Sequence, residues 1–128
     1  MNKPSFWWLA ELYKDKARLK PSEIELAWQN LSQGESAPEL ESACECLSKL
    51  SVEFFDFSGR HKFGLGKPRN LVRLALLYPM LVPHYFNLAN PNGVAPEKKA
   101  DLLMFEHALR FVINLVWRQA RGSDCEQA

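Results

Sequence analysis

The stretch from Pro68 to Leu88, PRNLVRLALLYPMLVPHYFNL, constrains the fold of this chain more than any other. Between Arg73 and His84 it holds no charged residue, so every side of a helix formed there must meet an apolar environment. A membrane span needs roughly 20 mostly apolar residues. The uncharged run is about half that length and is interrupted by Pro79. We therefore expect a buried helix that kinks or breaks at Tyr78-Pro79, because proline lacks an N–H and clashes with the preceding turn.

The length and cysteine content place the chain among single-domain proteins of a reducing compartment. At 128 residues it is the size of one domain. We expect a single helical domain over residues 1–122 and a disordered tail over 123–128. The three cysteines, Cys44, Cys46 and Cys125, are an odd number, and the first residues lack the pattern of a signal peptide. Free thiols and a cytoplasmic location are the expectation.

Aromatic residues dominate the first expected helix, which Ser5 can cap and which reaches about Leu19. Phe6, Trp7 and Trp8 are consecutive, and Phe6, Leu9 and Tyr13 are among the residues that share one helical stripe. Such a cluster either fills a core or forms a docking patch. The core interpretation is favoured, because aromatic side chains dominate interior packing.

Two capping boxes, S-x-x-E, predict the starts of the next two helices. Ser22 and Glu25 open a helix that ends at Gly34, and Ser36 and Glu39 open a third. The third continues to about Phe57 in the favoured interpretation. Alternatively, SVEFFDF is a strand that pairs with RHKFGLG across Ser58-Gly59 as a hairpin.

The last expected helix is long. Pro96 suits its first turn, and Gly122 is the predicted stop. Its inner seam is Leu102, Phe105, Leu109, Val112 and Val116, widened by Leu103, Phe111, Ile113 and Leu115. The chain is therefore expected to be an all-α bundle of five to six helices, with a kinked central helix and a long C-terminal one. Core residues should include Leu74, Leu77, Met80, Leu81, Leu109, Ile113 and Val116.

No group of residues predicts a reaction. Cys44 and Cys46 are two apart, so on a helix they point to different sides and make a poor thiol pair. Glu53, Asp56 and His61 are too few for an oxygen-rich metal site. No nucleophile is placed by sequence beside His84, or beside the mid-helix pair Glu106 and His107. We expect no enzyme activity, metal, cofactor or small-molecule substrate.

The near-neutral net charge of +1 conceals a segregation of charge along the chain. Residues 1–57 hold six Lys/Arg against ten Asp/Glu, whereas residues 58–73 hold five basic residues and no acid. The basic segment is a glycine-rich loop that runs into a helix start, and helix N-termini bind phosphates. Arg69 and Arg73 are four apart and so share a helix face. The candidate contact residues are Arg60, Lys62, Phe63, Lys67, Arg69 and Arg73.

Three interpretations of the basic segment remain open: a solvated loop, a nucleic-acid phosphate backbone as the ligand, or an acidic protein partner. The leading hypothesis is a non-enzymatic module that binds RNA or DNA through residues 60–73. In size, helical character and basic face, the chain is similar to small helical subunits of nucleoprotein assemblies, such as those of RNA-guided defence complexes. The alternative is a protein-binding adaptor, inhibitor or subunit that uses the aromatic N-terminus and the acidic face of residues 35–53.

Overall fold

The computed structural model describes residues 5–12, 18–33, 38–55 and 64–127, and the side chains of these residues up to Arg121. Six α-helices lie within those ranges, and the described part contains no strand. They are α1 (Trp7–Leu12), α2 (Pro21–Gln33), α3 (Pro38–Phe54), α5 (Pro68–Leu77), α6 (Leu81–Ala89) and α7 (Lys99–Gln127), with a 3₁₀ turn η1 (Pro96–Lys98) before α7. The predicted all-α fold is confirmed. No helix in these ranges has the length and apolar character that a membrane crossing requires.

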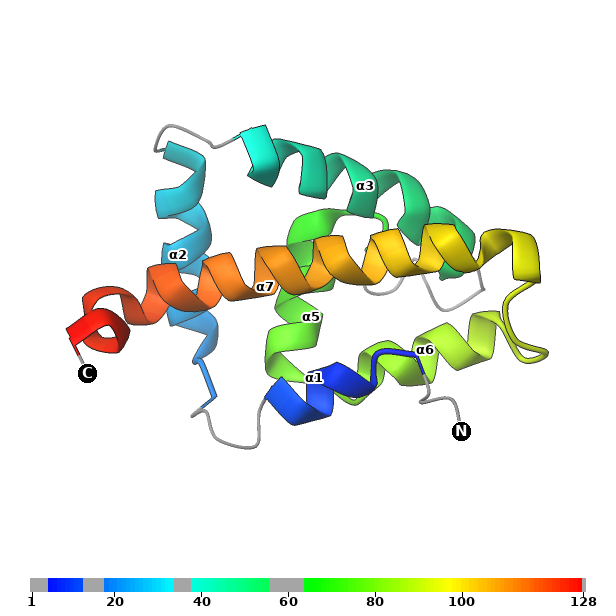
Figure 1. The fold of residues 1–128 in the computed structure, drawn as a ribbon. Helices are drawn as coiled ribbons and strands as arrows, with labels where there is room; N and C mark the ends of the chain where they lie inside the picture. The colour runs from blue at the N-terminus through cyan, green and yellow to red at the C-terminus, as the bar shows by residue number, and fades with distance from the viewer. Residues whose placement is uncertain (1–4, 13–17, 34–37, 56–63, 128) are drawn as a thin grey trace.

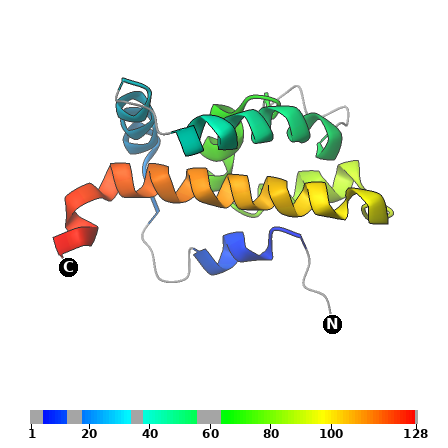
Figure 2. The same ribbon diagram turned by 45° about the horizontal axis from the view of Figure 1, so that its top comes forward.

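The long helix α7 organises the molecule. It has 29 residues and is therefore about 43 Å long. It packs against α2, α3 and α5 (Figure 1). In the turned view α3 lies above it and α1 below it (Figure 2). The expected core residues Leu109, Ile113 and Val116 of this helix are completely buried. The stretch 68–88 is thus one of several elements that cover α7.

That stretch forms two helices, because the chain breaks at Tyr78-Pro79 as the proline predicts. Tyr78 has φ −136° and ψ 69°, which ends α5, and α6 begins at Leu81. The break puts Met80 in the turn between the helices, where it is 67 % exposed, so its predicted burial is wrong. Leu74 is buried, whereas Leu77 and Leu81 are only partly buried at the edge of the core.

The starts and ends of α2 and α3 differ in detail from the sequence prediction. The predicted box of Ser22 and Glu25 is wrong, because α2 begins at Pro21. Glu23 makes the capping contact instead: its Oε1 accepts a hydrogen bond from the Lys20 N–H at 2.8 Å. α3 ends at Phe54, so residues 51–54 are helical rather than part of a strand. The rest of the alternative hairpin includes residues 56–63, outside the described ranges.

The first helix, α1, is described from Trp7 to Leu12 and is held by buried aromatic rings; Leu19, its expected end, is not helical. Phe6 lies within 5.2–6.1 Å of the rings of Phe55, Phe86 and Phe105, measured between centroids. Phe6 and Trp8 are buried, and this confirms the core interpretation of the aromatic cluster for those two residues. The backbone of Phe6 has φ +64°, a conformation that costs a bulky residue of order 1–3 kcal/mol. Tight packing of its ring offsets that cost.

The C-terminal end of α7 and its exposed face also differ from the prediction. The helix continues through Gly122 to Gln127, so the expected stop is wrong, and residues 123–127 belong to the helix rather than to a tail. Glycine costs only about 1 kcal/mol in a helix and does not end one by itself. Leu103 and Phe111, which were expected to widen the buried seam, are 61 % and 36 % exposed. They lie on the other side of the helix.

Candidate functional site

The start of α5 carries the described part of the predicted basic site. Lys67 is exposed and precedes the helix in an extended conformation, with Pro68 at the first helical position. Arg69 is exposed in the first turn of α5 and Arg73 in the second. Arg60, Lys62 and Phe63 lie outside the described residues. The structure therefore brings three of the six predicted contact residues to one helix end.

The two arginines converge on a single carboxylate of α2. Arg69 Nη2 forms an ion pair with Glu25 Oε2, and Arg73 Nη1 lies 3.7 Å from Glu25 Oε1. Both guanidinium groups therefore project from one face of α5, as their four-residue spacing predicts. Their side chains are 51 % and 48 % exposed, and that of Glu25 is 41 % exposed. Water screens such pairs strongly, so each is worth about 1 kcal/mol or less.

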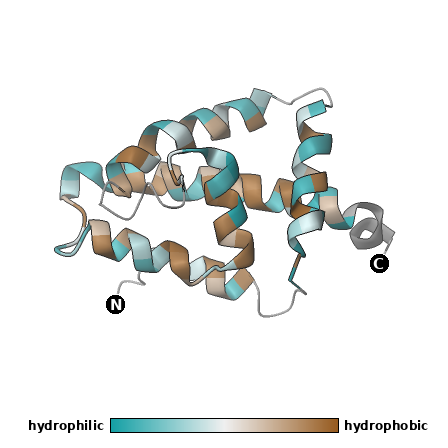
Figure 3. Cartoon of the chain, turned by 180° about the vertical axis from the view of Figure 1, so that it is seen from behind, coloured by the Kyte–Doolittle hydropathy of each residue, from teal (hydrophilic) through white to brown (hydrophobic). Residues whose placement is uncertain are grey.

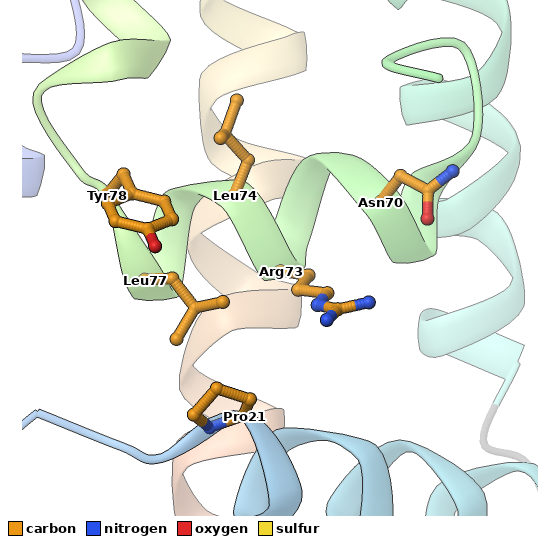
Figure 4. A pocket seen from close by; sticks show the side chains of 6 residues that line it. All are labelled: Pro21, Asn70, Arg73, Leu74, Leu77 and Tyr78. Carbon is orange, nitrogen blue, oxygen red and sulfur yellow. The ribbon is translucent and has the colours of Figure 1, made fainter. Parts of the chain in front are cut away.

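A groove between α2 and α5 surrounds this three-residue bridge. Seen from behind, α2 and α5 lie in front of α7 (Figure 3). On one side of Glu25 a hollow of about 310 Å³ lies between Pro21 of α2 and Arg73, Leu77 and Tyr78 of α5 (Figure 4). On the other side a hollow of about 300 Å³ is lined by Arg69 and by Trp28, Gln29, Ser32 and Gln33 of α2. The bridge thus divides an open groove into two parts.

Glu25 was the residue that sequence reasoning missed. The capping pattern assigned it to the start of α2, and no local signal relates it to arginines 44 and 48 residues away. Lys98 of η1 pairs with an acidic residue of α3. Its Nζ lies 3.4 Å from Glu53 Oε1 at the end of α3. The described part of the predicted basic site therefore lies on the α2–α5 side, and Glu25 partly compensates its charge.

A second exposed surface, apolar rather than basic, runs along the outer side of α7. Leu103 and Met104 are 61 % and 54 % exposed, and His107 and Phe111 continue the row. A hollow of about 540 Å³ lies between this row and the first half of α3. A smaller one, of about 180 Å³, lies between it and Trp7 of α1. Of the three consecutive aromatic residues Phe6, Trp7 and Trp8, only Trp7 is exposed.

Glu106 has a structural task, which its mid-helix position did not indicate. Its Oε1 accepts hydrogen bonds from the Phe6 N–H at 2.8 Å and from the Trp8 Nε1–H at 2.7 Å. The guanidinium of Arg110 lies 5.7 Å from the centroid of the Trp8 ring, which adds a cation–π contact. Together these groups fasten α1 to α7. Trp8, Glu106 and Arg110 also line the smaller hollow, but their contacts with one another hold α1 in place.

Cys44, Cys46 and His84 carry further groups capable of chemistry. Burial raises the pKa of the Cys44 thiol, and burial together with the nearby Asp101 carboxylate raises that of Cys46. Both thiols therefore hold little thiolate at neutral pH. His84 is exposed and its ring lies against that of Tyr85. Within the described ranges no group of three His, Cys, Asp or Glu side chains is placed to hold a metal ion.

Comparison with protein-family models, with curated proteins and with solved structures finds no significant match. Two surfaces are therefore the candidates for function, the basic α2–α5 groove and the apolar face of α7.

Proposed function

We propose that this protein is a non-enzymatic helical module that contacts a nucleic-acid phosphate backbone through the basic start of α5. The observation that carries the proposal is the placement of Lys67, Arg69 and Arg73, three exposed cations within two turns of a helix N-terminus. Lys and Arg contacts supply most sequence-independent affinity for nucleic acids. The unbonded N–H groups of the helix start favour phosphate as well.

Glu25 sets the strength of this site. Its carboxylate offsets one of the three positive charges and occupies donors of two guanidinium groups. A phosphate that enters the groove competes with it for the same N–H donors. Because the bridge is largely exposed, breaking it costs little, about 1 kcal/mol. We expect modest affinity, strong salt dependence and little preference for base sequence, as contacts to phosphates carry no base information.

A protein-binding function is the second candidate, and the exposed apolar row on α7 favours it. Of the three rings in the predicted aromatic docking patch at the N-terminus, Phe6 and Trp8 are buried and only Trp7 is exposed. The acidic face keeps its basis, since Glu39, Glu41 and Glu45 of α3 are exposed.

The test of the nucleic-acid proposal is a charge-reversal experiment with fluorescent single-stranded RNA and duplex DNA. The double variant Arg69→Glu, Arg73→Glu should abolish binding measured by anisotropy. In the wild-type protein, log K should fall against log salt with a slope of roughly −2 for three cations, and of about −4 if Arg60 and Lys62 also contribute.

The control is Lys49→Glu, Arg118→Glu, which makes the same change in net charge at exposed positions of α3 and α7. It should keep most of the affinity. Circular dichroism establishes that both variants fold. If the two new glutamates beside Glu25 unfold the charge-reversal variant, the neutral variant Arg69→Gln, Arg73→Gln replaces it. Binding that is indifferent to both salt and the Arg69/Arg73 changes excludes this function.

A further inference from the structure

The outward face of α7 repeats with the spacing of a coiled-coil seam. Its positions are Ala100, Met104, His107, Phe111 and Asn114, separated by four, three, four and three residues. A partner helix packs against such alternation of threes and fours. Ala100, Met104, His107 and Phe111 are exposed, and Leu103 stands beside them at 61 % exposure. This set, with Leu103, is called the outer seam below.

The outer seam is separate from the seam that builds the core. Leu102, Phe105 and Leu109 point inward and are buried together with Val112 and Val116. A helix that only needs to cover a core is apolar on one stripe and polar on the other. α7 instead carries large apolar side chains on two sides. Contiguous exposed apolar surface of this kind marks a site of association.

Hollows on both sides give the outer seam the shape of a docking site. The larger hollow is lined by Pro38, Ala43 and Cys46 of α3 and by Ala108 and Phe111 of α7. The smaller one lies between Trp7 and Leu103. A ridge with a groove on each side is the form into which the side-chain ridges of another helix fit. The flexible side chain of Met104 helps such a surface adapt to its partner.

The charge beside the seam determines the kind of partner. Glu39 lines the larger hollow, and Glu45 is exposed on the same helix. The first half of α3, residues 38–48, contains three exposed glutamates and no basic residue, and Arg110, which lines the smaller hollow, lies over the Trp8 ring. A second copy paired with its α7 antiparallel to this one would set two acidic α3 helices against each other. A cationic partner meets attraction at the same place.

We propose that the outer seam docks an amphipathic α-helix of another protein, whose apolar stripe lies on the seam and whose Lys/Arg flank lies over α3. The seam covers 15 residues, so the partner helix has about four turns, roughly 21 Å. The surface lies on the opposite side of the molecule from the α2–α5 groove (Figures 1 and 3). It operates independently of phosphate binding there.

The experiment uses a displayed library of helical peptides, randomised at surface positions and selected on the full-length protein. Retained peptides should carry apolar residues at alternating spacings of three and four and an excess of Lys and Arg. The best peptide should bind the variant Leu103→Asp, Met104→Asp at least about tenfold more weakly than the wild type. The variant Glu39→Lys, Glu45→Lys should also weaken it.

The chain offers a matched control. Leu26→Asp, Met80→Asp changes the same two residue types at positions that are 58 % and 67 % exposed elsewhere on the surface. It should bind the peptide as the wild type does. The proposal is overturned if no peptide is retained, if retained peptides are acidic, or if seam and control variants behave alike. It is also overturned if the protein alone dimerises and Leu103→Asp, Met104→Asp abolishes the dimer, because the occupant is then a second copy.

Discussion

Two glutamates, Glu25 and Glu106, each hold two groups from a distant part of the chain, but in different surroundings. Glu106 accepts two hydrogen bonds from Phe6 and Trp8, about one hundred residues earlier, and Glu25 receives two guanidinium groups from α5. Both residues are half-buried and each lines a hollow, but the hydrogen bonds of Glu106 are partly buried beside phenylalanine rings, whereas the ion pair of Glu25 with Arg69 is exposed. Burial of the contact, and not the number of partners, therefore decides whether it serves the fold or stays available to a ligand.

The largest effect is expected at the buried side of this comparison. Phe6→Ala removes the ring that joins α1 to Phe55, Phe86 and Phe105, and it should lower the free energy of unfolding by about 3–5 kcal/mol. Urea denaturation measures the change. The exposed Leu26→Ala should stay within about 0.5 kcal/mol of the wild type. Equal losses in the two variants would mean that α1 is not part of the cooperative core.

Removing the Glu106 carboxylate should have an intermediate effect. Glu106→Ala leaves the Phe6 N–H and the Trp8 Nε1–H without their acceptor, and it should cost about 1–3 kcal/mol in the same measurement. Glu106→Gln keeps an acceptor oxygen and should recover much of the loss. If glutamine were as harmful as alanine, the negative charge rather than the two hydrogen bonds would be what holds α1.

The smallest effect on stability is expected at Glu25, together with a change in binding. Glu25→Gln should alter the free energy of unfolding by less than about 1 kcal/mol, because the bridge is exposed. It should also raise the affinity for RNA or DNA severalfold and steepen the salt dependence by roughly one unit of slope, since two guanidinium groups are released. An unchanged or lower affinity would show that the arginines of the bridge do not contact phosphate.

The sequence predicted those features well that depend only on residues within about one helical turn of each other. Pro68 and Pro96 each stand at the start of a helical element, and Pro79 separates α5 from α6. The face shared by Arg69 and Arg73 also followed from helical spacing alone. These features depend on backbone geometry, which neighbouring residues determine.

The errors of the sequence prediction have a common physical cause: the spacing of neighbouring residues does not show which distant residues they contact in the fold. Leu103 and Phe111 have the same apolar character as the buried Leu109, and only the packing of α2, α3 and α5 on one side of α7 separates them. Glu25 fits a capping box, but its carboxylate reaches α5 instead. Met80 belongs to an apolar run, yet the break at Pro79 turns it to solvent. Half of the predicted basic site, Arg60, Lys62 and Phe63, lies outside the described residues, and its role stays a prediction.

The position of α7 after α2, α3 and α5 in the chain also matters during synthesis. The apolar faces of α2, α3 and α5 are covered by a helix that the ribosome makes after all of them. Until residues 99–121 have left the exit tunnel, those faces have no native surface to pack against. Until that point the nascent chain carries exposed apolar surface, which favours chaperone binding and aggregation over early folding. We expect the native packing of α2, α3 and α5 to form only after α7 has emerged.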